Sequence, residues 1–198
     1  MVRANPRPLG MMDGLDASFD GVLFIGYHAS TTNPRGVRAH TMSSATLADL
    51  RLNGVSVTEG AWNAALAGHF GVPVLLVSGD DAAVEEVQKQ VPGIEGAVVK
   101  WSLGFHAART LTPEAAREVI RDKVKAALAR RASFHPVRVK TPVEVEVRFK
   151  NYRPAEVLSY LRVVERVDAH AVRFRAQDML EAARFLSFVL NYQPTLEP

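Results

Sequence analysis

Short apolar runs alternate with alanine-rich segments along the first two thirds of the chain. Residues 22–25, 72–77 and 96–101 are dominated by apolar side chains, and short runs of this kind predict buried strands. The segments 59–70 and 82–91 are rich in alanine and other helix formers, and they predict helices. Strands that alternate with helices indicate an α/β fold.

The last third of the chain has a different pattern. In residues 143–149 apolar side chains alternate with charged ones, as expected for a half-exposed strand in an antiparallel or mixed sheet. A helix over 154–161, strands within 163–174 and an amphipathic helix over 177–192 follow. We therefore expect an α/β protein with a mixed sheet flanked by helices, and a C-terminal α+β subdomain over 132–198.

Two local signals between the first strand and the first helix are specific. Asn53-Gly54 separates two apolar runs, and this pair is the strongest short signal for a β-hairpin. Thr58 is a good N-cap for the helix that is expected to begin at Glu59. The hairpin should bring Glu59 back toward the ends of the strands.

Three side chains in this part of the chain are candidates for metal or proton chemistry. His28 follows the first strand, and ligands of open α/β sheets bind outside the carboxyl ends of the strands. Glu59 lies in a first helical turn, where the helix dipole favours a carboxylate. His40 lies in a long polar loop, and long loops are often functional. The residues alone leave a structural role open, since a lone histidine or a first-turn glutamate commonly has no chemical task.

Other candidates carry less weight. Asp80 and Asp81 are further candidate ligands at the end of a predicted strand, but the helix that follows directly favours N-cap duty. The remaining histidines are expected to have surface or structural roles; they are His69, His106, His135 and His170.

Composition narrows the chemistry. The chain has 198 residues, 47% of them hydrophobic, and no cysteine, which excludes disulfides, thiolate metal sites and a cysteine nucleophile. A metal would have to be held by histidines and carboxylates, which suits zinc among several ions. The net charge of +3 comes without a basic cluster interleaved with aromatics, so we expect no nucleic-acid partner. No apolar run approaches membrane-spanning length, so we expect a cytoplasmic protein with no membrane partner.

Several stretches, taken together and in order, resemble the D-aminopeptidase family of zinc metallopeptidases, the type encoded with bacterial dipeptide-transport genes. None is a strong motif by itself, but the set spans nearly the whole chain. The stretches are NPRPLGMMDGLD (5–16), FDGVLFIGYHA (19–29), GVRAHTM (36–42), LNGVSVTEGAWNA (52–64), VPVLLVSGDD (72–81), AVVK (97–100) and QDMLEA (177–182).

The resemblance implies a function and a site. It implies a zinc-dependent aminopeptidase that hydrolyses N-terminal D-amino acids from short peptides and forms ring-like homo-oligomers. His28 and Glu59 match zinc ligands of the family, and His40 matches its proposed catalytic nucleophile. Residues 1–131 would then be the remainder of the family's α/β metal-site domain.

One departure from the family changes these expectations. Family members carry a further N-terminal segment that supplies the remaining zinc ligands, whereas this chain begins with Met1-Val2-Arg3 inside the family's first domain. We therefore expect an N-terminally truncated member, with an open sheet edge and weak zinc retention. Two alternatives stay open: a non-catalytic remnant or assembly subunit of the same family, and a generic small-molecule-binding α/β domain without a metal. The first 18 residues are expected to be an extended surface segment.

Overall fold

The first of two sheets is mixed, and its order is β1-β4-β5-β6. The computed structural model describes residues 7–191. Strands β1 (Val22–Tyr27), β4 (Val74–Asp80) and β5 (Glu95–Gly104) are parallel. Strand β6 (Ala107–Thr110) returns antiparallel to β5. All of β4 is buried, as expected for a central parallel strand covered on both faces.

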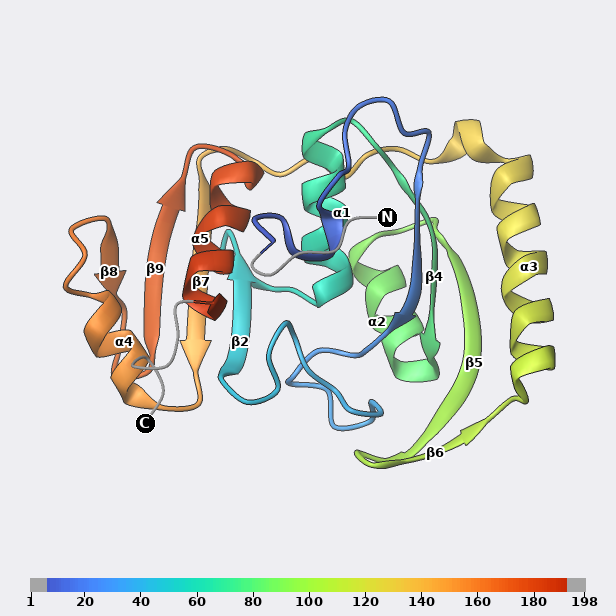
Figure 1. Ribbon diagram of the computed structural model, residues 1–198, viewed down its shortest axis with the longest axis horizontal. Helices are drawn as coiled ribbons and strands as arrows, with labels where there is room; N and C mark the ends of the chain where they lie inside the picture. The colour runs from blue at the N-terminus through green and yellow to red at the C-terminus, as the bar shows by residue number, and fades with distance from the viewer. Residues whose placement is uncertain (1–6, 192–198) are drawn as a thin grey trace.

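Helices cover both faces of this sheet. Figure 1 shows α1 (Glu59–His69) and α2 (Asp81–Gln90) on the face toward the second sheet, and α3 (Pro113–Ala129) on the opposite face. Each helix begins where a side chain caps it. The side chains of Thr58, Asp80 and Thr112 accept hydrogen bonds from backbone N–H groups in the first turns of α1, α2 and α3 respectively.

The second sheet is antiparallel, and its order is β3-β2-β7-β9-β8. Its strands are β2 (Leu47–Leu52), β3 (Val55–Ser56), β7 (Val143–Phe149), β8 (Val164–Arg166) and β9 (Ala171–Ala176). The sheet therefore combines two strands from the first third of the chain with three from the last third (Figure 1).

Three short helical segments and one long helix complete the fold. Helix α5 (Met179–Asn191) packs on β9 and β7 and also contacts α1. Helix α4 (Tyr152–Leu158) lies at the end of the second sheet, and η2 (Arg131–Ser133) follows α3. Segment η1 (Gly10–Met12) packs against α1. Within residues 7–191 no helix is both long and apolar enough to cross a membrane.

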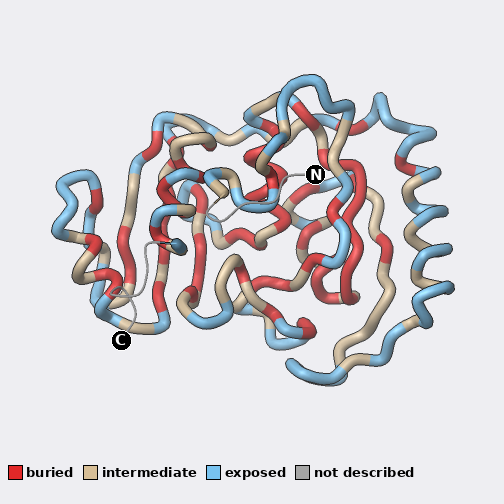
Figure 2. Tube along the Cα trace, viewed as in Figure 1, coloured by how far each residue is buried: buried red, intermediate tan, exposed pale blue. Residues whose placement is uncertain are grey.

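Helix α1 occupies the centre of the molecule. Every residue from 60 to 68 is buried (Figure 2), which explains why most of these residues are small or apolar. At the end of α1 the segment that contains Val137 comes very close to the helix. A Cβ added to Gly68 would lie 1.8 Å from the carbonyl oxygen of Val137. The small residues of α1 therefore let a second segment cross the helix.

The predicted α/β fold with a mixed sheet flanked by helices is confirmed. The hairpin at Asn53-Gly54 is confirmed as well: Leu52 pairs with Val55, and φ is 48° at Asn53 and 82° at Gly54, as a type I′ turn requires. The division at 131/132 stays a prediction, and the second sheet takes strands from both sides of it.

Two sequence-based expectations were wrong in part. Residues 7–18 are not simply an extended surface segment, because η1 interrupts them and Met12, 6% exposed, joins the core. The charged face of β7 is not uniformly half-exposed, because Glu146 is 8% exposed. Its carboxylate accepts a hydrogen bond from the guanidinium of Arg173 at 3.1 Å, which makes this burial tolerable. Residues 1–6 and 192–198, which include the start of the predicted extended segment and the last residue of the predicted helix over 177–192, lie outside the described residues.

Candidate active site

His28 directly follows β1, and its ring is held by the backbone of the next loop. Its Nδ1 lies 2.9 Å from the carbonyl oxygen of Val37. A carbonyl can only accept, so Nδ1 carries the proton and the neutral ring keeps its free lone pair on Nε2. Histidine ligands of metals are commonly oriented by this kind of bond.

His40 returns from the loop to the same place. Its backbone N–H donates to the carbonyl of Ala29 at 2.9 Å, which places His40 beside the residue that follows His28. Its Nδ1 donates to the carbonyl of Arg38 at 2.7 Å, so Nε2 is again the free nitrogen. The centroids of the His28 and His40 rings are 4.9 Å apart. The fold thus makes neighbours of two histidines that are separated by a long loop.

The backbone on both sides of His40 is unusual. Arg38 has φ of 53° and Met42 has φ of 62°, a left-handed region that residues with a side chain rarely adopt. Such conformations persist only where the surroundings enforce them, and they cluster at functional sites. Here the backbone N–H of Arg38 donates to the carbonyl of Phe105 at the β5–β6 turn, at 2.8 Å.

Two carboxylates, Asp80 and Glu86, hold the part of the loop that lies between His28 and His40. Glu86 accepts hydrogen bonds from the backbone N–H and hydroxyl of Ser30 and from the side chain of Asn33. Asp80, 0% exposed, caps α2 through Oδ1 and accepts from the backbone N–H of Val37 through Oδ2, at 3.2 Å. Since the carbonyl of Val37 orients His28, Asp80 supports the position of that ring indirectly.

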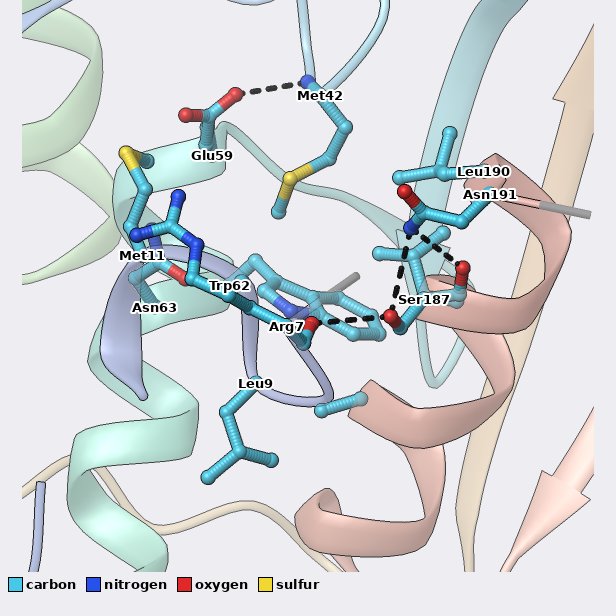
Figure 3. Close-up of a pocket in the computed structure, with 13 residues that line it drawn as sticks. Arg7, Leu9, Met11, Met42, Glu59, Trp62, Asn63, Ser187, Leu190 and Asn191 are labelled. Carbon is cyan, nitrogen blue, oxygen red and sulfur yellow. Dashed lines mark hydrogen bonds between the residues drawn. The ribbon is translucent and has the colours of Figure 1, made fainter. Parts of the chain in front are cut away.

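Glu59 lies in the first turn of α1, and its Oε2 accepts a hydrogen bond from the backbone N–H of Met42 at 2.8 Å. This bond ties Glu59 to the loop two residues after His40. Thr58, the N-cap residue next to Glu59, is also held in place, because its backbone N–H and its hydroxyl both donate to Oε1 of Gln90. Glu59 also lines a pocket of 280 Å³ between α1, α5 and the N-terminal segment (Figure 3).

The phenol of Tyr27 is buried and interacts electrostatically with Glu59. Burial raises the pKa of the Tyr27 phenol above its usual value, and the nearby Glu59 carboxylate raises it further, against a lowering by the hydrogen bond from Asn63. That bond runs from Nδ2 of Asn63 to the phenol oxygen at 2.9 Å. The carboxylate of Glu59 therefore acts electrostatically on the phenol of Tyr27, the last residue of β1.

The structure brings the predicted site residues together only in part. His28 and His40 are in ring contact, and Glu59 is bonded to the loop that carries His40. Within residues 7–191, however, no three histidine or carboxylate side chains gather closely enough to hold a metal ion. Asp80 is an N-cap, as the sequence favours. His106 contacts the loop from the β5–β6 turn, where its Nδ1 lies 3.4 Å from Nη1 of Arg38.

Two contributors to the site have no local sequence signal. Glu86 stands in a helix and bonds a loop more than 50 positions earlier. Arg7 lies near the N-terminus and lines the same pocket as Glu59. Both depend on how distant segments pack, which periodicity and spacing do not encode.

A family model described as Peptidase_M55, D-aminopeptidase, matches residues 1–188 of this chain. The chain belongs to the D-aminopeptidase family. Within this family, the D-aminopeptidase of Bacillus subtilis strain 168 is 33% identical over 183 residues, which are 92% of this chain and 66% of the relative. The chain therefore spans slightly less than two thirds of that relative's length.

A solved structure of this D-aminopeptidase family has the same fold. It is described as a Zn-dependent D-aminopeptidase, DppA, from Bacillus subtilis, a self-compartmentalizing protease. The TM-score is 0.90 at 31% sequence identity, over 98% of this chain and 71% of the solved chain. The resemblance noted from the sequence is thus confirmed at the level of the family and the fold.

Proposed function

We propose that this chain belongs to a zinc-dependent aminopeptidase that removes N-terminal D-amino acids from short peptides. In this proposal His28 and Glu59 are zinc ligands, and His40 is the nucleophile or general base. Membership of the D-aminopeptidase family supports the reaction, and the description of the related structure as Zn-dependent supports the metal. The main structural support is the pair of neighbouring imidazoles, His28 and His40, whose Nδ1 atoms are both hydrogen-bonded to backbone carbonyls.

This arrangement suits different tasks for the two histidines. A neutral imidazole with Nδ1 protonated can ligate a metal through Nε2 or take a proton there. His40 sits in the strained segment between Arg38 and Met42, which fixes its ring relative to the end of β1. We assign His40 the proton transfer or nucleophilic attack, and His28 the ligand position.

The zinc site is incomplete within residues 7–191. The donors present fit zinc in kind, since it binds histidine nitrogen and carboxylate oxygen. They do not fit in number, since catalytic zinc usually has three protein ligands and the described residues contain no group of three. The proposal therefore requires ligands from polypeptide outside the described residues.

The test combines zinc content after dialysis with release of D-Ala from D-Ala-D-Ala. We expect the 198-residue chain by itself to retain little zinc and to be a poor enzyme. In a preparation that retains zinc, His40→Ala should lower turnover by at least about 100-fold, the usual contribution of a general acid or base. It should leave the zinc content nearly unchanged, whereas His28→Ala should lower both.

His69→Ala is the matched control, because His69 is exposed at the opposite end of α1 from Glu59. It should change neither readout. Parallel loss of zinc in His40→Ala would make His40 a ligand instead. Stoichiometric zinc and rapid release by the 198-residue chain alone would show that its own residues complete the site.

A second candidate function is that of a non-catalytic assembly subunit of the same family. The favouring observation is strand β1, which lies at the edge of its sheet with Leu23 39% and Ile25 56% exposed. Apolar side chains along an open edge favour pairing with another chain. We propose homo-oligomerisation, as the relative described as self-compartmentalizing suggests. Stable oligomers that still lack zinc and D-Ala release when polypeptide that could supply the missing ligands is present would favour this candidate.

A further inference from the structure

The pocket beside Glu59 is small and has a distinct chemical character. It holds 280 Å³ and is enclosed by the N-terminal segment, the start of α1 and the last turns of α5 (Figure 3). Its apolar wall includes Trp62, Met42, Leu186 and Leu190. Ligand pockets commonly measure from roughly 300 to 1,000 Å³, so this one suits a ligand of only a few heavy atoms beside an apolar surface.

Two charged residues line this pocket, Arg7 and Glu59. Figure 3 shows the guanidinium of Arg7 directed toward the side of the pocket where Glu59 and Met11 lie. The backbone of Arg7 is anchored, since its carbonyl accepts a hydrogen bond from the hydroxyl of Ser187 on α5 at 3.1 Å. Among the described residues, however, its guanidinium has no hydrogen bond and no ion-pair partner. The pocket therefore presents an unused cation.

We infer that this pocket receives the C-terminal residue of a dipeptide and that Arg7 binds its terminal carboxylate. The inference rests on the proposed function, because it places the scissile carbonyl near Glu59. One residue of extended chain spans roughly 3.5 Å, so the carboxylate of a dipeptide lies about that far beyond the scissile carbonyl. A receptor for it must therefore lie in the same pocket as Glu59, and Arg7 lines that pocket.

The guanidinium of Arg7 and the terminal carboxylate of a dipeptide are chemically complementary. A guanidinium presents parallel N–H donors to a carboxylate, and such charge-assisted pairs are stronger than neutral hydrogen bonds. The apolar wall at Trp62 and Leu190 accommodates a small apolar side chain. Arg7 is thus a specificity-determining residue for short peptides with a free C-terminal carboxylate.

The experiment compares binding of two non-hydrolysable reduced dipeptides, the D-Ala-D-Ala analogue and its C-terminal amide, to the full 198-residue chain. The wild type should bind the acid at least about tenfold more tightly than the amide, as expected for loss of one charge-assisted bond. Arg7→Met should remove this preference, because it keeps the aliphatic stem of the wall but not the charge. Affinities are measured by NMR titration, and thermal unfolding checks that the variant folds.

Arg121→Met is the matched control, since Arg121 is exposed on α3 on the far side of the first sheet (Figure 1). It should retain the preference for the acid. Equal affinity of the wild type for both peptides, absence of binding included, overturns the inference, and so does a preference that survives in Arg7→Met. The proposed function is tested separately by hydrolysis. In a preparation that retains zinc, acid preference without hydrolysis refutes the function alone, and hydrolysis without acid preference refutes the pocket assignment alone.

Discussion

Replacing Asp80 by alanine removes two hydrogen bonds from a carboxylate that is 0% exposed. The first bond caps α2 at the backbone N–H of Ala83, and loss of an N-cap costs about 1 kcal/mol. The second satisfies the backbone N–H of Val37, and a buried donor without a partner costs about 1–3 kcal/mol. We therefore expect Asp80→Ala to lower the free energy of unfolding by roughly 2–4 kcal/mol.

Asp80→Asn separates the two bonds. Asparagine caps helices about as well as aspartate, but its amide has only one acceptor oxygen. If that oxygen keeps the cap at Ala83, the N–H of Val37 faces an NH₂ group instead of an acceptor. The expected cost is then that of the second bond, about 1–3 kcal/mol. Because Val37 orients His28, this variant should also weaken any metal bound at His28.

The assay is equilibrium unfolding in urea, which reports the free energy of unfolding and its change on mutation. Asp81→Ala is the control. Asp81 is half-exposed and, within residues 7–191, its carboxylate accepts one long hydrogen bond, from the backbone N–H of Ser102 at 3.5 Å. It otherwise complements the dipole of α2. It should cost under about 1 kcal/mol. An Asp80→Ala variant that unfolds like Asp81→Ala would refute the assigned role of this carboxylate.

Two further predictions concern the surface. Pairing with Lys89 and Arg35 lowers the pKa of Glu85 to about 2 from 4.5, so its stabilising contribution is present above pH 4.5 and is lost as the pH falls toward 2. NMR titration should find this value, Glu85→Gln should remove that part of the pH dependence, and an unshifted titration would contradict the pairing. Ile25→Lys should shift the chain toward monomers in analytical ultracentrifugation, because it places a charge on the exposed edge of β1; unchanged association would place the interface elsewhere.

Elements whose signals are local could be predicted from the sequence. The cap at Thr58 and the turn at Asn53-Gly54 act within a few residues, and both form as expected. The pairing of β2 with β7 could not be predicted, since an alternating pattern shows that a strand has one buried face but does not name its neighbour.

The same distinction applies to the candidate site. His28, His40 and Glu59 were identified from their types and from the family resemblance, but their contacts depend on the path of the loop. The ring contact of the two histidines arises because the loop is anchored at several points, by Asp80 and Glu86 among others. Those anchors connect segments far apart in the chain, so no window of sequence contains them.

The burial of α1 has a consequence for its length. The helix begins at Glu59, in the candidate site, and ends where Gly68 lies directly under the carbonyl of Val137. Each residue of an α-helix adds about 100° of rotation and 1.5 Å of rise. An insertion or deletion between these two points would therefore either turn Glu59 away from Met42 or drive a larger side chain against Val137. Homologous chains should vary the identity of the residues inside this helix more readily than their number.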